Sequence, residues 1–253
     1  MSNIKVNVTQ NGTTTLATEG CYCERDIDVI VNAPDRYEEG RKAEYDAFWD
    51  SFQQNGNRQS YNLAFGGYWG RQTFKPKYDI VPTTLNSAFH SLCQNDTEWY
   101  TFDMVEHLQE LGVVLDTSIC TNFTSAFMWA HIGRIGVIDC RAAKSGLTGT
   151  FAYGKIKTID KVIVNDGNTY PNTFASQGQL ENITFEGVIG AEISFKDCTK
   201  LSKASIESVV GALSSTTSGL TLTLSRTAKQ AAFTDEQWAA LIATKPNWTI
   251  SLV

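Results

Sequence analysis

Three histidines are the most versatile chemical groups in this 253-residue chain, because a histidine can transfer protons or bind a metal near neutral pH. His90, His107 and His131 are spread along the middle of the chain. No two of them have the H-x-x-x-H or H-E-x-x-H spacing that puts metal ligands on one face of a helix. We therefore expect ordinary surface or helix-end histidines.

Pairs of carboxylates are the second candidates, since most glycoside hydrolases use two of them. Asp103, Glu106 and Glu110 share one side of a predicted helix, as expected for a solvated helix face. Asp235 and Glu236 occupy the first turn of another predicted helix, where capping and the helix dipole explain them. Neither set forms a convincing catalytic pair.

No other motif points to catalysis or to a cofactor. The run Asp166-Gly167-Asn168 looks like a piece of a calcium loop but lacks the further acidic residues that such a loop needs. The chain contains no G-x-S-x-G motif and no phosphate-binding loop. The sequence has six cysteines but no C-x-x-C, so we predict buried free thiols. We expect a protein that is not an enzyme and that holds no cofactor or metal.

Binding is the remaining function, and two sets of side chains are candidates for it. The first set contains aromatic residues near predicted turns, which we expect to be exposed anchors for a glycan or a protein: Trp99, Tyr100, Trp129, Tyr153 and Tyr170. The second set contains outward-facing residues of successive predicted strands: Val114, Asp116, Ile138, Cys140, Asp160, Thr184 and Glu186. Their mixture of apolar and acidic groups suits a binding surface, and it equally suits a plain exposed sheet.

Composition and charge limit the partners. Hydrophobic residues make up 42% of the chain and charged residues 19%, as in ordinary globular proteins. A net charge of −6 without a Lys/Arg cluster argues against nucleic-acid binding, which depends on phosphate contacts. No apolar run is long enough to insert into a membrane, and the N-terminus lacks the apolar core of a signal peptide, so we expect synthesis in the cytosol.

The elements that position these residues are predicted by an internal repeat. A phenylalanine recurs at steps of 24, 38, 24, 23 and 21 residues. Two further apolar positions step by 24 through most of the same region. The three registers are Phe65, Phe89, Phe127, Phe151, Phe174 and Phe195; Leu108, Ile132, Ile156, Leu180 and Leu201; and Leu111, Ile135, Ile159 and Ile183. Registers that share one period predict the stacked coils of a solenoid.

Each coil is expected to contribute one short strand to a parallel sheet. The predicted strands are 112–116, 136–140, 161–164 and 184–188. The longer step between Phe89 and Phe127 predicts a helical insertion over 102–111. The end, 201–253, is predicted to be a cap made of helix 201–213, strand 220–224, a helix from Thr234 to Ala243 and strand 248–252.

Two elements precede the repeats. Residues 1–34 alternate apolar and polar side chains around Asn11-Gly12, which predicts a small all-β module with a hairpin. Residues 35–57 predict a connecting helix with an aromatic stripe, which either covers the open end of the solenoid or packs against other copies of the chain. The repeats and their cap then occupy 58–253.

The repeats resemble a known family. HIGRIGVIDCRAAKSGLTGTFAYG and KIKTIDKVIVNDGNTYPNTFASQG are similar to units of the BspA-like, Treponema-type leucine-rich repeats, and the resemblance covers roughly 60–250. It implies an α/β leucine-rich-repeat solenoid with parallel strands, one per coil of about 24 residues.

The flanking segments resemble phage proteins. IKVNVTQNGTTTLATEGCYCERDIDVIV looks like a β module of tail and fibre-type proteins of phages that infect gut Firmicutes, and YDAFWDSFQQNGNR with IATKPNWTISLV resembles repeat proteins of such phages and prophages. The resemblance implies a non-enzymatic virion protein of tail, fibre or decoration type that contacts a host-cell glycan or protein. Its implied partners are other virion proteins, through 1–34, and one or two further copies of itself. A bacterial BspA-like surface adhesin is the first alternative, and a tail-associated glycan hydrolase is the second.

Overall fold

A computed structural model describes residues 7–10, 13–16, 47, 74–144 and 146–253 of the chain. The chain divides into two compact units, Met1–Arg41 and Lys42–Val253. In the first unit, strands β1 (Asn7–Gln10) and β2 (Thr13–Leu16) pair antiparallel, with Gln10 opposite Thr13. This pairing confirms the predicted hairpin. The rest of the β module and most of the predicted connecting helix lie outside the described residues; Ala47 is helical.

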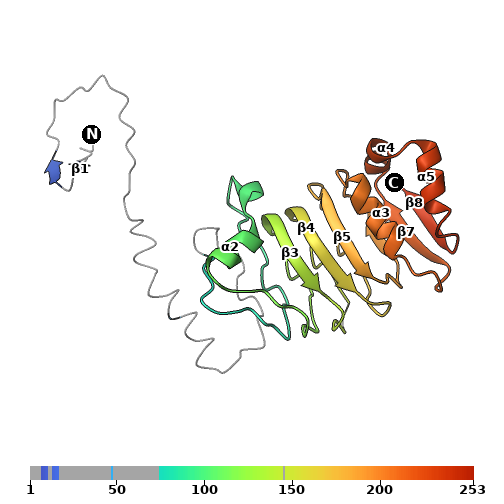
Figure 1. The fold of residues 1–253 in the computed structure, drawn as a ribbon, viewed down its shortest axis with the longest axis horizontal. Helices are drawn as coiled ribbons and strands as arrows, with labels where there is room; N and C mark the ends of the chain where they lie inside the picture. The colour runs from blue at the N-terminus through green and yellow to red at the C-terminus, as the bar shows by residue number, and fades with distance from the viewer. Residues whose placement is uncertain (1–6, 11–12, 17–46, 48–73, 145) are drawn as a thin grey trace, which may run out of the picture. The chain divides into compact units, whose positions relative to one another are not determined.

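The described residues of the second unit form an α/β fold with two parallel three-stranded sheets, β3-β4-β5 and β6-β7-β8 (Figure 1). In the range 74–253 it contains the 3-10 turn η1 (Trp99–Thr101) and helix α2 (Met104–Glu110). The remaining elements, in chain order, are β3 (His131–Asp139), β4 (Lys155–Val164), β5 (Asn182–Gly187), β6 (Ile193–Phe195), α3 (Lys203–Ala212), β7 (Leu220–Leu224), α4 (Arg226–Ala232), α5 (Asp235–Ile242) and β8 (Trp248–Leu252).

Residues 24 apart are neighbours in the first sheet. Ile132 pairs with Ile156 between β3 and β4, and Ile159 pairs with Ile183 between β4 and β5. The predicted parallel pairing at this spacing is confirmed. The strands are longer than predicted, because the I-x-x-I positions such as Ile132 and Ile135 belong to the strand and not to a segment before it.

The phenylalanines form a buried stack. Phe89, Phe127, Phe151, Phe174 and Phe195 lie in sequence order with ring centroids 4.4 to 5.6 Å apart, and none is more than 1% exposed. The first member of the register, Phe65, lies outside the described residues. Adjacent rings are nearly parallel, so each repeat buries one face of its phenylalanine against the repeat before it and one against the repeat after it.

Backbone hydrogen bonds between repeats fix this stack. Phe127 donates its N–H to the carbonyl of Thr150 in the next repeat, 2.7 Å away, whereas Met128 donates its N–H to Ser125 in its own repeat. The same alternation occurs in the repeats before and after. Every second amide therefore ties one repeat to the next.

The first repeats depart from the predicted register. Leu108 lies within α2 and Leu111 directly after it, so neither occupies the strand position that its 24-residue step predicts. The N-cap Asp103 forms a bridge with Arg134 instead. Segment 112–116 is not a strand; it forms one parallel bridge, between Leu115 and Ile80. The predicted insertion helix is confirmed, and it is this helix that displaces the register.

A helix covers the last edge of the first sheet. Ser205 and Ser208 of α3 accept hydrogen bonds from the backbone N–H groups of Ile183 and Phe185 in β5, at 2.9 and 2.8 Å. The two serine hydroxyls thus accept the hydrogen bonds that a further strand would accept from these two amides of β5. Strands β7 and β8 and helices α3 and α5 fall where the sequence predicts them, and Thr234 with Gln237 forms a capping box on α5. Helix α4 was not predicted.

The phenylalanine stack is testable by truncation of its central ring. Phe151→Ala should lower the free energy of unfolding by about 3–5 kcal/mol, because the cavity lies between two other rings. Urea denaturation measures the change, and Tyr100→Ala is the matched control because this ring is exposed. A loss below about 1 kcal/mol for Phe151→Ala would contradict a packed stack.

Candidate binding surfaces

Trp129 and Tyr153 form a stacked aromatic pair on the surface. Their ring centroids are 5.3 Å apart with the planes 20° from parallel. Trp129 is 42% exposed and Tyr153 38% exposed, so the pair presents apolar area to solvent as predicted for these two residues. One residue is in each of two successive repeats, and the backbone N–H of Trp129 donates to Ala152 in the repeat that holds Tyr153.

The backbone at these positions does not require an aromatic side chain. Trp129 and Tyr153 both have φ near +60°, a region that bulky residues rarely occupy. Ser91 and Ser176 hold the equivalent positions in the flanking repeats with φ of 62° and 54°. Since serine satisfies the same turn, the two exposed aromatics add nothing that the turn needs. Side chains that the fold does not require are candidates for binding.

The other predicted aromatic anchors differ from this pair. Tyr100 is exposed and packs edge-on against Trp99, which is half-buried and lies 6.2 Å from the His131 ring. The prediction that Tyr170 is exposed is wrong. It is 5% exposed and its hydroxyl has no hydrogen-bond partner among the described residues. Burial raises the Tyr170 pKa, so the ring acts as core and not as an anchor.

The predicted ladder of outward strand residues is correct only in part. Val114, Asp116, Thr184 and Glu186 are exposed, and Asp160 is half-buried. Ile138 and Cys140 are fully buried, which contradicts the prediction for both. The reason is that β3 buries Ile132, Ile135 and Ile138 at steps of three, so the strand does not keep the strict alternation on which the prediction rested.

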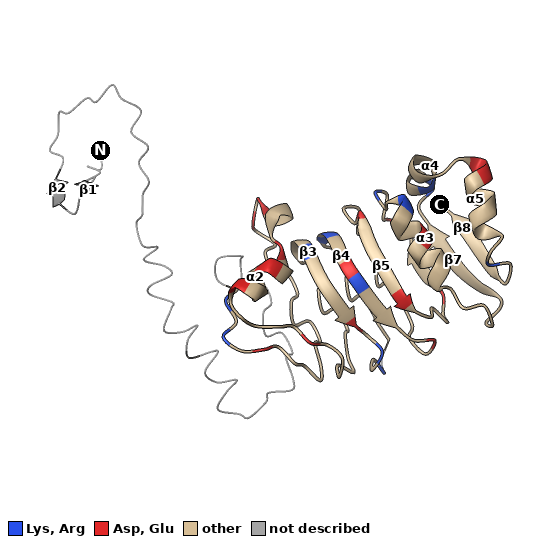
Figure 2. Ribbon diagram, in the orientation of Figure 1, with Lys and Arg blue, Asp and Glu red and all other residues tan. Residues whose placement is uncertain are grey.

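Ion pairs join neighbouring strands of the first sheet, and Figure 2 marks the charged positions along these strands. Arg134 donates to both carboxylate oxygens of Asp160 at 2.8 Å and to Oδ2 of Asp103 at 2.8 Å. The Oδ1 atom of Asp103 also caps α2. Lys161 pairs with Glu186 at 2.6 Å between β4 and β5. The basic groups of these pairs are thus neutralised by carboxylates.

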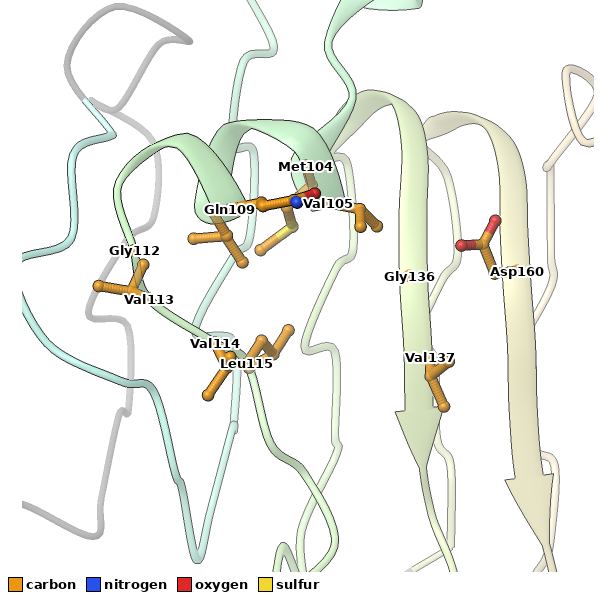
Figure 3. A pocket seen from close by; sticks show the side chains of 11 residues that line it. Met104, Val105, Gln109, Gly112, Val113, Val114, Leu115, Gly136, Val137 and Asp160 are labelled. Atoms are coloured by element: carbon orange, nitrogen blue, oxygen red, sulfur yellow. The ribbon is translucent and has the colours of Figure 1, made fainter.

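An apolar groove borders the first sheet beside α2. It has a volume of about 410 Å³ and lies between α2, residues 112–115 and strand β3 (Figure 3). Its lining residues are Met104, Val105, Leu108, Gln109, Gly112, Val113, Val114, Leu115, Gly136, Val137 and Asp160. Val114 and Asp160 are among the predicted surface residues, whereas Val137, which is 49% exposed, is not. The sequence carried an indication that Val137 is exposed, because the charged residue Lys161 occupies the position in the next strand that pairs with it.

The described cysteines are buried away from solvent, and the described residues that could bind a metal do not cluster. Cys93, Cys120, Cys140 and Cys198 are buried free thiols, as predicted; the two earlier cysteines lie outside the described residues. Burial raises the pKa of Cys120 to about 11 and that of Cys140 well above its usual value, so both stay protonated at neutral pH. In the described part of the chain no three His, Cys, Asp or Glu residues gather into a metal-ligating group.

Two of the histidines, His107 and His131, pack against other parts of the fold. His107 contacts the carbonyl of Phe74 and packs between the rings of Phe74 and Phe102. His131 is buried, and its Nδ1 has no hydrogen-bond partner among the described residues. Burial lowers the pKa of His131, and the charge of Lys155 lowers it further.

Comparison with known proteins adds no relative. No protein-family model, no curated protein and no solved structure matches the chain. No helix in the described ranges is both long and apolar enough to cross a membrane.

Acidification is expected to destabilise the chain partly through His131. The unfolded chain, in which the histidine pKa is 6.5, binds more protons than the folded chain, so stability is lost as the pH falls through that value. Urea midpoints measured between about pH 7 and pH 5 should fall less in His131→Gln than in the parent chain. Asn95→Gln, which changes an exposed side chain that does not titrate, is the control and should keep the parental dependence. If the urea midpoint of His131→Gln fell as much with pH as that of the parent chain, burial of His131 would not contribute to the acid sensitivity.

Proposed function

We propose that this chain is a non-enzymatic structural or binding protein of a phage particle, of tail, fibre or decoration type, which presents a leucine-rich-repeat surface for contact with the host cell. In this proposal residues 58–253 form a capped solenoid and residues 1–34 attach it to other virion proteins. The 24-residue pairing of β3, β4 and β5 and the continuous phenylalanine stack support the solenoid.

The observation that carries the binding role is the exposed stack of Trp129 on Tyr153. Aromatic rings bury large areas at a low cost in conformational entropy, which makes them effective anchors for proteins and for the apolar faces of sugars. Both rings are carried by turns that are hydrogen-bonded to the neighbouring repeats, so they are held in place before a ligand binds. We therefore place the host contact, a glycan or a protein, at this pair.

The location in a virion is supported by the resemblance of residues 4–31 to a module of phage tail and fibre-type proteins, and of residues 45–58 with 242–253 to repeat proteins of such phages and prophages. Fibre-type proteins act as oligomers, and the proposal includes a dimer or trimer formed through the N-terminal segments. A bacterial surface adhesin of the same repeat class is the competing assignment, and the two differ in where the protein is found.

A glycan hydrolase is the less favoured alternative. It would need two carboxylates facing a shared space about 5–10 Å wide. Asp103 and Asp160 are in neighbouring segments, but the guanidinium of Arg134 is bound to both and fills the space between them. The proposal therefore assigns them to holding the sheet together and assigns no catalytic residue.

The binding role is tested by replacing both aromatics with the residue found in the flanking repeats. The double variant Trp129→Ser, Tyr153→Ser keeps a side chain that Ser91 and Ser176 show to be compatible with the turn. Binding of the fluorescently labelled full chain to intact gut Firmicutes cells and to their purified wall polysaccharides should weaken about tenfold or more. Val253→Ser removes an exposed apolar residue elsewhere and serves as the control. Undiminished binding by a folded double variant would refute the contact site.

The virion assignment is tested by mass spectrometry of purified particles from an induced lysogen that carries the gene. The polypeptide should co-purify with the particles through a density gradient. Recovery from the cell envelope, with none in the particles, would favour the bacterial adhesin instead.

A further inference from the structure

The groove between α2 and β3 exists because the sheet is interrupted there. Above it, Asp103 bridges to Arg134, and below it the backbone N–H of Asp139 donates to the hydroxyl of Thr117 at 2.7 Å. Between these contacts, segment 112–116 pairs with Ile80, and no bridge between the described residues joins it to β3. No strand formed by the described residues occupies the position next to β3 at this level. Helix α2 forms one wall of the groove that results (Figure 3).

Apolar side chains remain exposed in and around this groove. Val114 is 56% exposed and Val137 is 49% exposed, and both line it. Leu111 and Val81 are also exposed: Leu111 precedes Gly112 of the lining, and Val81 follows Ile80, whose backbone is bonded to the segment that carries Val114. Exposed apolar side chains in the groove and in the segments that form it favour a macromolecular partner over a small molecule.

The surroundings of the groove are acidic. Residues 102–116 carry four carboxylates and no Lys or Arg. Among the described residues no cation pairs with Glu106, Glu110 or Asp116. Figure 2 shows the acidic residues on and beside α2. Of the basic groups nearby, Arg134 and Lys161 are already neutralised by carboxylates, and Lys75 and Lys77 follow Phe74, which His107 of α2 contacts. An approaching partner therefore meets an apolar slot with an excess of negative charge around it.

We infer that this groove docks a segment of a partner protein that carries a bulky aliphatic or aromatic side chain flanked by Lys or Arg. The apolar side chain fills the slot over Val114 and Val137, and the basic residues face Glu106, Glu110 and Asp116. An anionic lipid surface is disfavoured, because the same carboxylates repel it. This second interface is independent of the proposed host contact at Trp129 and Tyr153.

The test is selection of a displayed library of random 12-residue peptides on the immobilised full chain, with a groove-blocked variant for comparison. Val137→Lys is the blocking change, and a lysine is compatible with this place in the sheet because Lys161 holds the paired position in β4. Val188→Lys is the matched control, since Val188 is similarly exposed and does not line the groove. Enriched peptides should combine a bulky apolar residue with adjacent Lys or Arg. They should bind the parent chain and the control at least about tenfold more tightly than the blocked variant.

A second variant isolates the charges. Glu106→Gln, Glu110→Gln, Asp116→Asn leaves the slot intact and should weaken the same peptides severalfold at low salt, with a smaller difference at high salt. Enrichment of acidic or uncharged peptides, equal binding to the blocked variant, or no enrichment at all would overturn the inference. Concentration-dependent dimerisation that Val137→Lys abolishes would also overturn it, and would assign the groove to a second copy of the chain.

Discussion

The structure depends on the backbone hydrogen bonds that join each repeat to the next. In the turns that carry the phenylalanines, alternate amides donate forward to the following repeat and back to their own, so the offset between neighbours is set by the backbone and not only by side-chain packing. The fixed offset places Phe127 against Phe151 and Trp129 against Tyr153. The same constraint therefore builds the core and orders the exposed aromatic pair, although the two rings of that pair contribute little to the core.

Where this constraint is broken, the molecule gains a different kind of surface. Helix α2 is inserted before β3, and its N-cap Asp103 takes the bridge to Arg134 that a strand residue would otherwise make. The following segment pairs with Ile80 and leaves an apolar groove beside β3. The first sheet carries ion pairs such as Arg134–Asp160 and Lys161–Glu186, whereas the interruption presents apolar side chains among carboxylates that pair with no cation of the described residues. A repeat architecture can acquire separate interfaces in this way without a change to its core.

The sequence predicted the parallel pairing and the cap well, because both rest on local or strictly periodic signals. Ile132 and Ile156 are 24 residues apart in the sequence and are paired directly in the sheet. The Thr234–Gln237 capping box depends on residues within a stretch of four. Leu108 follows the same step but lies in α2, since its spacing from Met104 also fits a helix. Tyr170 was expected at the surface because turn residues surround it, and its burial depends on distant parts of the core. The groove could not be predicted, because it arises where two segments fail to pair.

The central claim is that inter-repeat hydrogen bonds hold the backbone of the exposed aromatics as firmly as that of the core phenylalanines. Amide hydrogen exchange of the full chain tests it most directly. The amides of Trp129 and Tyr153, which donate to the next repeat, should exchange as slowly as those of Phe127 and Phe151 despite the exposure of their side chains. Fast exchange at Trp129 and Tyr153 beside slow exchange at the two phenylalanines would contradict the account.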